Sequence, residues 1–173
     1  MKKSVLIPLD GSPFSRQIVP HIRQVLDPAA YRLVLLQVAE PAAGMLGVPP
    51  PPFSSNWPLP VHTYATAREV ERASHPIYAS QQEQNTCAEI QAALSAEQAL
   101  LRDSGYTVSV SVRFGDPAEE IVACARDADI DLVAMATHGR TGLRHLLMGS
   151  VAEQVLRRLA IPIMLVRPFA EEA

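Results

Sequence analysis

The sequence predicts an α/β protein in which a five-stranded parallel sheet lies between helices on both faces. Three observations lead to this prediction: short apolar runs recur along the chain, segments with helical apolar spacing lie between them, and turn residues separate the two. Strands covered on both faces are almost continuously apolar, and parallel strands need a crossover between them. The order β-α-β-(loop)-α-β-α-β-α-β therefore predicts a doubly wound sheet with right-handed crossovers.

Turn residues mark the first strand and helix. Val5 to Leu9 is an apolar run, and Gly11-Ser12-Pro13 follows it. Serine is a good helix N-cap and proline a good first helical residue, so we expect a helix from Pro13. Pro20 should kink this helix or shift its register. We expect its buried face to contain Phe14, Ile18, Ile22, Val25 and Leu26.

The later elements follow from the same kinds of signal. The capping box Asp116-Pro117-Ala118-Glu119 predicts a helix start. Serines alternate with valines at 108, 110 and 112, which predicts a half-buried strand near the sheet edge. We expect the other strands at 32–39, 131–136 and 161–166, and helices at 77–104, from 117, and at 150–159.

Residues 41–76 differ from the rest of the chain. They hold eight of the 15 prolines, including Pro49 to Pro52, and the first half shows neither a helical nor a strand period. We therefore expect a long surface loop, with a polyproline II piece, inserted in a single domain that spans residues 1–173.

Composition excludes several classes of protein. The chain has 173 residues, a net charge of −3 and no Lys/Arg cluster, which argues against nucleic acid or anionic membrane as a partner. The apolar run near the amino terminus is too short for a signal peptide or a membrane span. Cys87 and Cys124 fall on expected amphipathic helices and are predicted to be buried and reduced. We expect a cytoplasmic protein.

Ligands of open parallel sheets bind beyond the carboxyl ends of the strands, where the strand order reverses. Three segments of this chain come directly after predicted strands and are therefore candidates. They are Asp10-Gly11-Ser12, Ala39 with the proline-rich loop, and Thr137-His138-Gly139.

The sharpest pattern is Gly139, then nine residues, then Gly149-Ser150 at a predicted helix start. Glycine lets backbone amides approach a phosphate, Ser150 can cap the helix and donate its hydroxyl, and the helix start adds free N–H groups. Alternatively, Gly139 and Gly142 only make turns and Ser150 only caps, because short glycine patterns arise often by chance.

Other polar residues near this pattern could either contact a ligand or have a purely local role. Asp10 could hold a ribose hydroxyl or, through water, a phosphate-bound Mg²⁺, or it could only shape a turn. His138 could contact a ligand edge, but it has no partner at metal-ligand spacing. Arg140 could neutralise a phosphate or remain solvated. There is no Gly-x-Ser-x-Gly elbow and no Walker A lysine, so binding is favoured over catalysis, with at most slow nucleotide hydrolysis.

Four segments together resemble a known family. They are Val5 to Ser12, Gly115-Asp116-Pro117, Thr137 to Glu153 and Pro162 to Pro168. In combination they are similar to the universal stress protein family and its ATP-binding subgroup. The resemblance implies a Rossmann-like fold, related to the adenine nucleotide α-hydrolases, with strand order 3-2-1-4-5.

ATP-binding members of that family carry Gly-x2-Gly-x9-Gly-Ser/Thr, and here Ala136 replaces the first glycine. Alanine keeps the amide but disfavours a positive φ, so we expect binding to survive if the backbone at Ala136 is extended. The resemblance implies that Val38 contacts adenine through its backbone and Asp10 approaches the ribose and phosphates. The implied contacts to ATP, AMP or ADP with Mg²⁺ are Pro8, Asp10, Gly11, Ser12, Val38, Ala136, Thr137, His138, Gly139, Arg140, Gly142, Gly149, Ser150 and Val151.

The resemblance also implies a homodimer that pairs the last strands, Ile163 to Val166, and cover for an apolar edge is physically reasonable. The function that follows is an ATP-binding stress or signalling protein, acting through nucleotide-dependent conformation or partner binding. The alternative is a dimeric interaction module with a vestigial nucleotide site. The proline-rich loop could fold over the nucleotide or offer a partner surface.

Overall fold

The computed structural model describes residues 2–41, 76–137 and 148–169. The chain divides into two compact units, one made of residues 1–40 and 88–173 and the other of residues 41–87. Each unit is described by itself. The predicted proline-rich insert falls almost entirely outside the described residues, and the sheet belongs to the first unit.

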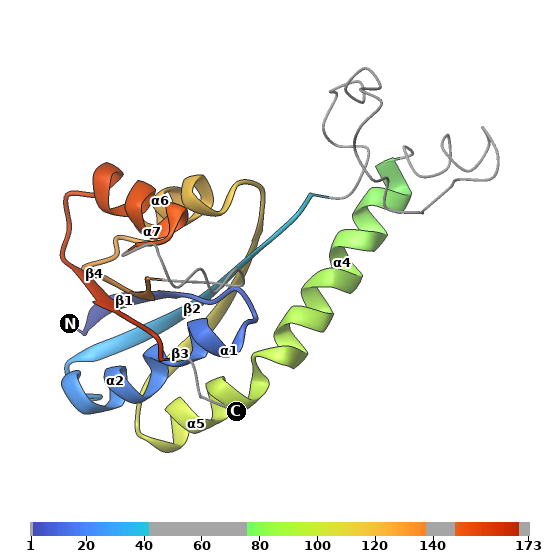
Figure 1. Cartoon of the computed structure of the whole chain (residues 1–173). Helices are drawn as coiled ribbons and strands as arrows, with labels where there is room; N and C mark the ends of the chain where they lie inside the picture. The colour runs from blue at the N-terminus through green and yellow to red at the C-terminus, as the bar shows by residue number, and fades with distance from the viewer. Residues whose placement is uncertain (1, 42–75, 138–147, 170–173) are drawn as a thin grey trace. The chain divides into compact units, whose positions relative to one another are not determined.

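The elements alternate along the chain as the apolar pattern predicts (Figure 1). They are β1 (Lys3–Pro8), α1 (Pro13–Arg16), α2 (Ile18–Val25), β2 (Tyr31–Ala39), α4 (Pro76–Ala93), α5 (Ser95–Asp103), β3 (Thr107–Phe114), α6 (Pro117–Asp127), β4 (Leu132–Ala136), α7 (Ser150–Arg158) and β5 (Ile163–Val166).

The five strands form one sheet in the order β3-β2-β1-β4-β5, and all neighbouring strands are parallel. This confirms the predicted fold class and strand order. The chain builds outward from β1 on one side and then returns to place β4 on the other side. The strand order therefore reverses between β1 and β4, where an open sheet of this kind leaves a crevice at the carboxyl ends of its strands.

Two apolar cores lie on the two faces of the sheet. Residues of α2, α5 and the end of α4, including Ile22, Leu101 and Ile90, cover one face. Residues of α6 and α7, including Ile121 and Val155, cover the other, and Figure 1 shows these two helices on the opposite side of the sheet from α2 and α5. Burial of both faces explains why the central strands are nearly continuously apolar.

The first predicted helix is broken at Gln17 into α1 and α2. Pro20 gives the physical reason, because it has no N–H to donate to the carbonyl of Arg16 one turn earlier. Two of the buried positions expected for the first helix were wrong. Phe14 is only half-buried and Val25 is 66% exposed, whereas Ile18, Ile22 and Leu26 are buried.

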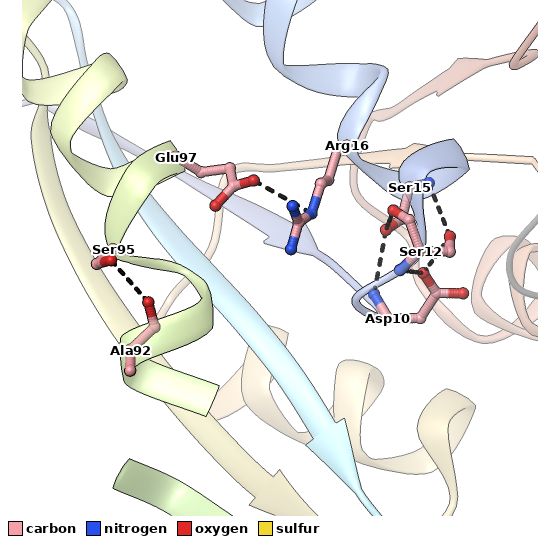
Figure 2. A network of polar contacts seen from close by, with 7 residues as sticks. All are labelled: Asp10, Ser12, Ser15, Arg16, Ala92, Ser95 and Glu97. Carbon is pink, nitrogen blue, oxygen red and sulfur yellow. Dashed lines mark hydrogen bonds and ion pairs between the residues drawn. The ribbon is translucent and has the colours of Figure 1, made fainter. Parts of the chain in front are cut away.

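The predicted helix 77–104 is likewise two helices, with the buried Leu94 between α4 and α5. The Ser95 hydroxyl donates to the Ala92 carbonyl across this junction at 2.6 Å (Figure 2). Serine side chains that bond to a carbonyl of the preceding turn often bend helices. The two cysteines are both free, but only Cys124 is buried and Cys87 is half-buried.

The cap predicted for α6 and the edge position predicted for β3 are confirmed. The Glu119 amide donates to Asp116 Oδ1 at 3.0 Å at the start of α6, and Ile121, Val122 and Ala125 of this helix are buried. Strand β3, with its alternating serines, is an edge strand of the described sheet. In the described part of the chain, no helix is long and apolar enough to cross a membrane.

Candidate functional site

The carboxyl end of the sheet brings together segments that are far apart in the sequence. Strand β1 ends at Pro8 and runs into the turn before α1, β2 ends at Ala39, and β4 ends at Ala136 just before Thr137. Because all strands are parallel, these ends share one edge. This edge holds every described residue that the sequence predicted for the site.

The turn after β1 is built by Asp10 and two serines (Figure 2). Asp10 Oδ1 accepts from the Ser12 amide at 2.9 Å and from the Ser12 hydroxyl at 2.6 Å. The Ser12 hydroxyl oxygen in turn accepts from the Ser15 amide at 3.1 Å, which caps α1 as predicted. Gly11 between them has φ +79°, a conformation that glycine adopts without a steric cost. The turn is thus fixed by its own hydrogen bonds.

The end of β2 extends beyond β1. The last pair between the two strands is Pro8 with Leu36, and the Leu36 carbonyl accepts from the Leu9 amide at 2.8 Å. Backbone groups of a strand point alternately to its two neighbours, so the N–H and C=O of Val38 point to the same side as those of Leu36. On the other side, the Ala39 carbonyl accepts from the Gly115 amide at 3.0 Å. The backbone of Val38 therefore faces the side on which β1 has already ended.

The end of β4 and the start of α7 are joined directly. Thr137 is buried, its amide donates to the Val166 carbonyl at 2.8 Å, and its carbonyl accepts from the Gly149 amide at 2.6 Å. This last bond places the amino terminus of α7 beside the end of β4.

The cap of α7 differs from the prediction. Gly149, not Ser150, is the N-cap residue, and because glycine has no side chain it makes no side-chain capping bond. Ser150 is the first helical residue and is exposed, and Val151 is half-buried against the core below α6 and α7. Gly149 has φ −72° and ψ 154°, an extended conformation that any residue can adopt. Gly149 is thus not needed for backbone geometry.

We expected nucleotide binding to survive the replacement of glycine by Ala136 if the backbone there is extended, and it is extended. Ala136 is the last residue of β4 and pairs with Val166 of β5, so its backbone is extended. Among the described residues, the only non-glycine residue with a positive φ is Asp129, which lies outside this edge. Four further predicted site residues, His138, Gly139, Arg140 and Gly142, lie outside the described residues.

Sequence reasoning missed Gln37, a polar residue near the end of the apolar strand β2. Its Oε1 atom is buried and has no hydrogen-bond partner. It also missed the ion pair between Arg16 Nε and Glu97 Oε1, 3.1 Å apart, which links α1 to α5 (Figure 2). The signal for Gln37 was present in Leu33-Val34-Leu35-Leu36-Gln37, where one polar side chain interrupts an apolar run.

The resolved pKa shifts lie away from these residues. Burial raises the pKa of the Cys124 thiol on α6, and burial raises the pKa of the Tyr106 hydroxyl before β3. Within the described ranges, no group of three or more His, Cys, Asp or Glu side chains is placed to hold a metal ion. The described part of the carboxyl edge offers backbone amides, hydroxyls and the Asp10 carboxylate, which suit binding.

Fold and edge together define a doubly wound α/β protein of the class that places ligands at the carboxyl ends of its strands. A sequence profile described as the Universal stress protein family matches residues 57–167. The chain belongs to the universal stress protein family.

Two curated relatives come from Methanocaldococcus jannaschii. Universal stress protein MJ0577 is 39% identical over 67 residues, which cover 39% of this chain and 41% of the relative, so the match spans less than half of that protein. Universal stress protein MJ0531 is 28% identical over 168 residues, which cover 95% of this chain and 82% of the relative.

Solved structures show the same fold. A structure of MJ0577 has a TM-score of 0.72 at 23% identity and covers 99% of both chains. A universal stress protein in complex with cAMP has a TM-score of 0.59 at 18% identity, covering 96% of this chain and 97% of that one. A family protein from Arabidopsis thaliana with AMP bound has a TM-score of 0.57 at 13% identity, covering 98% and 94%.

Proposed function

We propose that this universal stress protein binds ATP, or a related adenine nucleotide, at the carboxyl edge of its sheet and acts through nucleotide-dependent conformation or partner binding. The observation that carries the proposal is the bond between Gly149 and the Thr137 carbonyl, which sets the start of α7 beside the end of β4. The reversal of strand order between β1 and β4 puts the Asp10 turn at the same edge.

Each part of a nucleotide has a suitable group at this edge. The N-cap of α7 is a glycine, which offers no side-chain acceptor to the first-turn amides, and a helix amino terminus favours a phosphate. The Asp10 carboxylate suits a ribose hydroxyl or, through water, a Mg²⁺ ion on the phosphates. The backbone of Val38 offers one donor and one acceptor to an adenine edge. Family structures described with cAMP and AMP support the same ligand class.

The test is calorimetric titration of the purified protein with ATP and Mg²⁺, repeated on Gly149→Val. Because the backbone at Gly149 is extended, we expect valine to be tolerated by the fold while its branched side chain obstructs the phosphates at the helix start. Binding should fall at least about tenfold with a near-native melting temperature, since one obstructed charge-assisted contact is worth about 1.5–3 kcal/mol. No binding by the wild type at millimolar ATP would refute the proposal.

The competing function is a dimeric interaction module whose nucleotide site is vestigial. It is favoured by one observation, the alanine at position 136 where ATP-binding members have glycine. The extended backbone at Ala136 weakens this argument, since no positive φ is needed there. The same titration separates the two functions, because a vestigial site would leave ATP unbound while the oligomeric state is kept.

We also propose a homodimer through β5. All four residues of this strand are half-buried, and β5 is the second edge strand of the described sheet. The Pro162 and Val166 carbonyls accept from the Val133 and Thr137 amides, so the backbone groups of Ile163 and Leu165 point away from β4. An unpaired apolar edge is a template for a second strand.

Light scattering after gel filtration tests the dimer with two variants at one position. Leu165→Pro removes an outward N–H and spares the ladder with β4, and Leu165→Ala removes side-chain volume but keeps the N–H. We expect a dimer for the wild type and Leu165→Ala, and a monomer for Leu165→Pro. A monomeric wild type would rule out the interface.

A further inference from the structure

Gln37 is a polar side chain on an apolar strand face. Residues 33, 35 and 37 of β2 share one face because side chains of a strand alternate. Leu33 and Leu35 are fully buried in the core below α2 and α5. Gln37 is the next residue on that face, at the carboxyl end of the strand, and it is half-buried. On this face of β2, the apolar side chains of the core are thus followed by the polar amide of Gln37 at the start of the candidate site.

Within the described part of the chain, the amide oxygen of Gln37 has no hydrogen-bond partner. Three buried side-chain atoms of the described residues make no hydrogen bond: Arg16 Nε, Glu97 Oε2 and Gln37 Oε1. The first two belong to one ion pair, in which the charges compensate each other. Gln37 Oε1 has no such compensation, and a buried acceptor without a donor costs free energy. Such an atom is retained at a cost unless something else supplies the donor.

The position of Gln37 indicates what that donor is. A Cβ atom placed on Gly11 would lie 3.7 Å from Gln37 Nε2, so the amide group lies next to the turn of Asp10 and Ser12. The following residue, Val38, directs its backbone to the same side of β2 as β1. If a nucleotide binds between the Asp10 turn and Val38, its ribose lies next to the Gln37 side chain. This step rests on the nucleotide site proposed above.

We propose that Gln37 is a specificity-determining residue that accepts a hydrogen bond from a ribose hydroxyl of the bound nucleotide. Phosphate oxygens that carry no proton only accept hydrogen bonds, so they cannot satisfy Oε1, whereas a ribose hydroxyl donates. A site that has a buried acceptor for a hydroxyl discriminates against the ligand that lacks it, because the acceptor is then left unpaired. Gln37 would therefore distinguish ribonucleotides from deoxynucleotides.

The ligand series that tests this is ATP, 2′-deoxy-ATP, 3′-deoxy-ATP and inosine triphosphate, titrated into the wild-type chain by calorimetry. Removal of one of the two hydroxyls should weaken binding about 3- to 10-fold, the size of one net hydrogen bond. Equal affinity for ATP and both deoxy forms would overturn the assignment of Gln37. Absence of ATP binding would instead overturn the nucleotide site itself, so the two failures are distinguishable.

The variant Gln37→Met keeps the side-chain length and removes the acceptor. It should weaken ATP binding by about the same factor and abolish the difference between ATP and the deoxy form, while the ratio of ATP to inosine triphosphate stays unchanged. A change in that last ratio would show that Gln37 reads the base, which overturns the ribose assignment. Gln24→Met, at an exposed position on α2, is the matched control and should change neither ratio.

Thermal melting of the ligand-free protein supplies a second readout. Because Gln37→Met removes an unpaired buried acceptor, we expect the melting temperature to stay the same or rise. A merely structural glutamine would lose stability on this change and leave the deoxy discrimination intact. That combination of results would contradict the proposal.

Discussion

At the amino end of the sheet, polar groups pair with other groups of the protein, whereas at the carboxyl end several do not. The Ser4 amide donates to Asp131 Oδ2 at 2.7 Å, Arg32 Nε donates to Ser4 Oγ at 2.7 Å, and the Asp131 amide donates to the Ser4 carbonyl at 2.9 Å. At the carboxyl end, Gln37 Oε1 is unpaired and the first turn of α7 has no side-chain cap.

This difference suggests that the amino end of the sheet serves stability and the carboxyl end serves ligand binding. The bonds at the amino end join β1 to the start of β2 and to the residue before β4. Groups at the carboxyl end keep donors and acceptors that a ligand can use, at some cost in stability. Variants at the amino end should therefore change stability and spare nucleotide binding. Variants of the groups at the carboxyl end that make no bond within the described residues should do the reverse.

The largest effect is expected for Asp131→Ala at the amino end. It removes the acceptor of the Ser4 amide, and Ser4 is only 2% exposed. We expect the free energy of unfolding to fall by about 2 kcal/mol, measured by urea denaturation. Asp131→Asn keeps an acceptor oxygen and should lose less than half as much. ATP affinity should match the wild type in both variants. A large loss of affinity would contradict the idea that the amino end affects only stability.

A pair of serine variants compares the two helix starts at the carboxyl end. Ser12→Ala removes the cap of α1 and the bond to Asp10 Oδ1, so it should cost about 1–1.5 kcal/mol of unfolding free energy. Ser150→Ala removes an exposed hydroxyl that caps nothing and should cost less than about 0.5 kcal/mol.

For ATP binding, in contrast to stability, we expect a clear effect of Ser150→Ala, because Ser150 is exposed at the start of α7. Loss of one hydrogen bond to a phosphate predicts ATP affinity about 10-fold weaker for Ser150→Ala. Calorimetry on both folded variants measures this. If Ser150→Ala bound ATP as tightly as the wild type, the start of α7 would lose its assigned role.

Among the buried groups, the smallest effect on stability is expected for Tyr106, which precedes β3 at the amino end and is 4% exposed. Its hydroxyl donates to the Leu26 carbonyl at the end of α2, and Tyr106→Phe should cost about 1 kcal/mol. Burial raises the pKa of this hydroxyl above its unfolded value of 10.0. Since the folded state then holds the proton more tightly, its contribution to stability is complete below pH 10 and decreases as the pH rises above 10.

Unfolding by urea at pH 9, 10 and 11 checks this dependence. The wild type should lose stability over that range faster than Tyr106→Phe, in which the titrating group is absent. Parallel curves for the two proteins would show that Tyr106 is not the source of the alkaline loss.

Several parts of the fold could be read from sequence because their causes are local. Strand positions followed from apolar runs, and the starts of α1 and α6 followed from Ser12-Pro13 and Asp116-Pro117. Pro20 indicated that the first helix would be interrupted, but it did not indicate at which residue. Whether the helix would kink or restart in a new register depends on packing against the sheet, which is why Val25 was wrongly expected to be buried.

The candidate site divides in the same way. Local sequence picked out Asp10, Gly149 and Ser150, since turns and helix starts have their own residue preferences. Tertiary structure alone decided that the Gly149 amide bonds to the Thr137 carbonyl, that Val38 extends past β1, and that Gln37 Oε1 has no donor. Each of these depends on the lengths of neighbouring strands and on groups far apart in the chain. A sequence fixes which hydrogen-bonding groups exist, whereas only the packed sheet determines which of them remain without a partner.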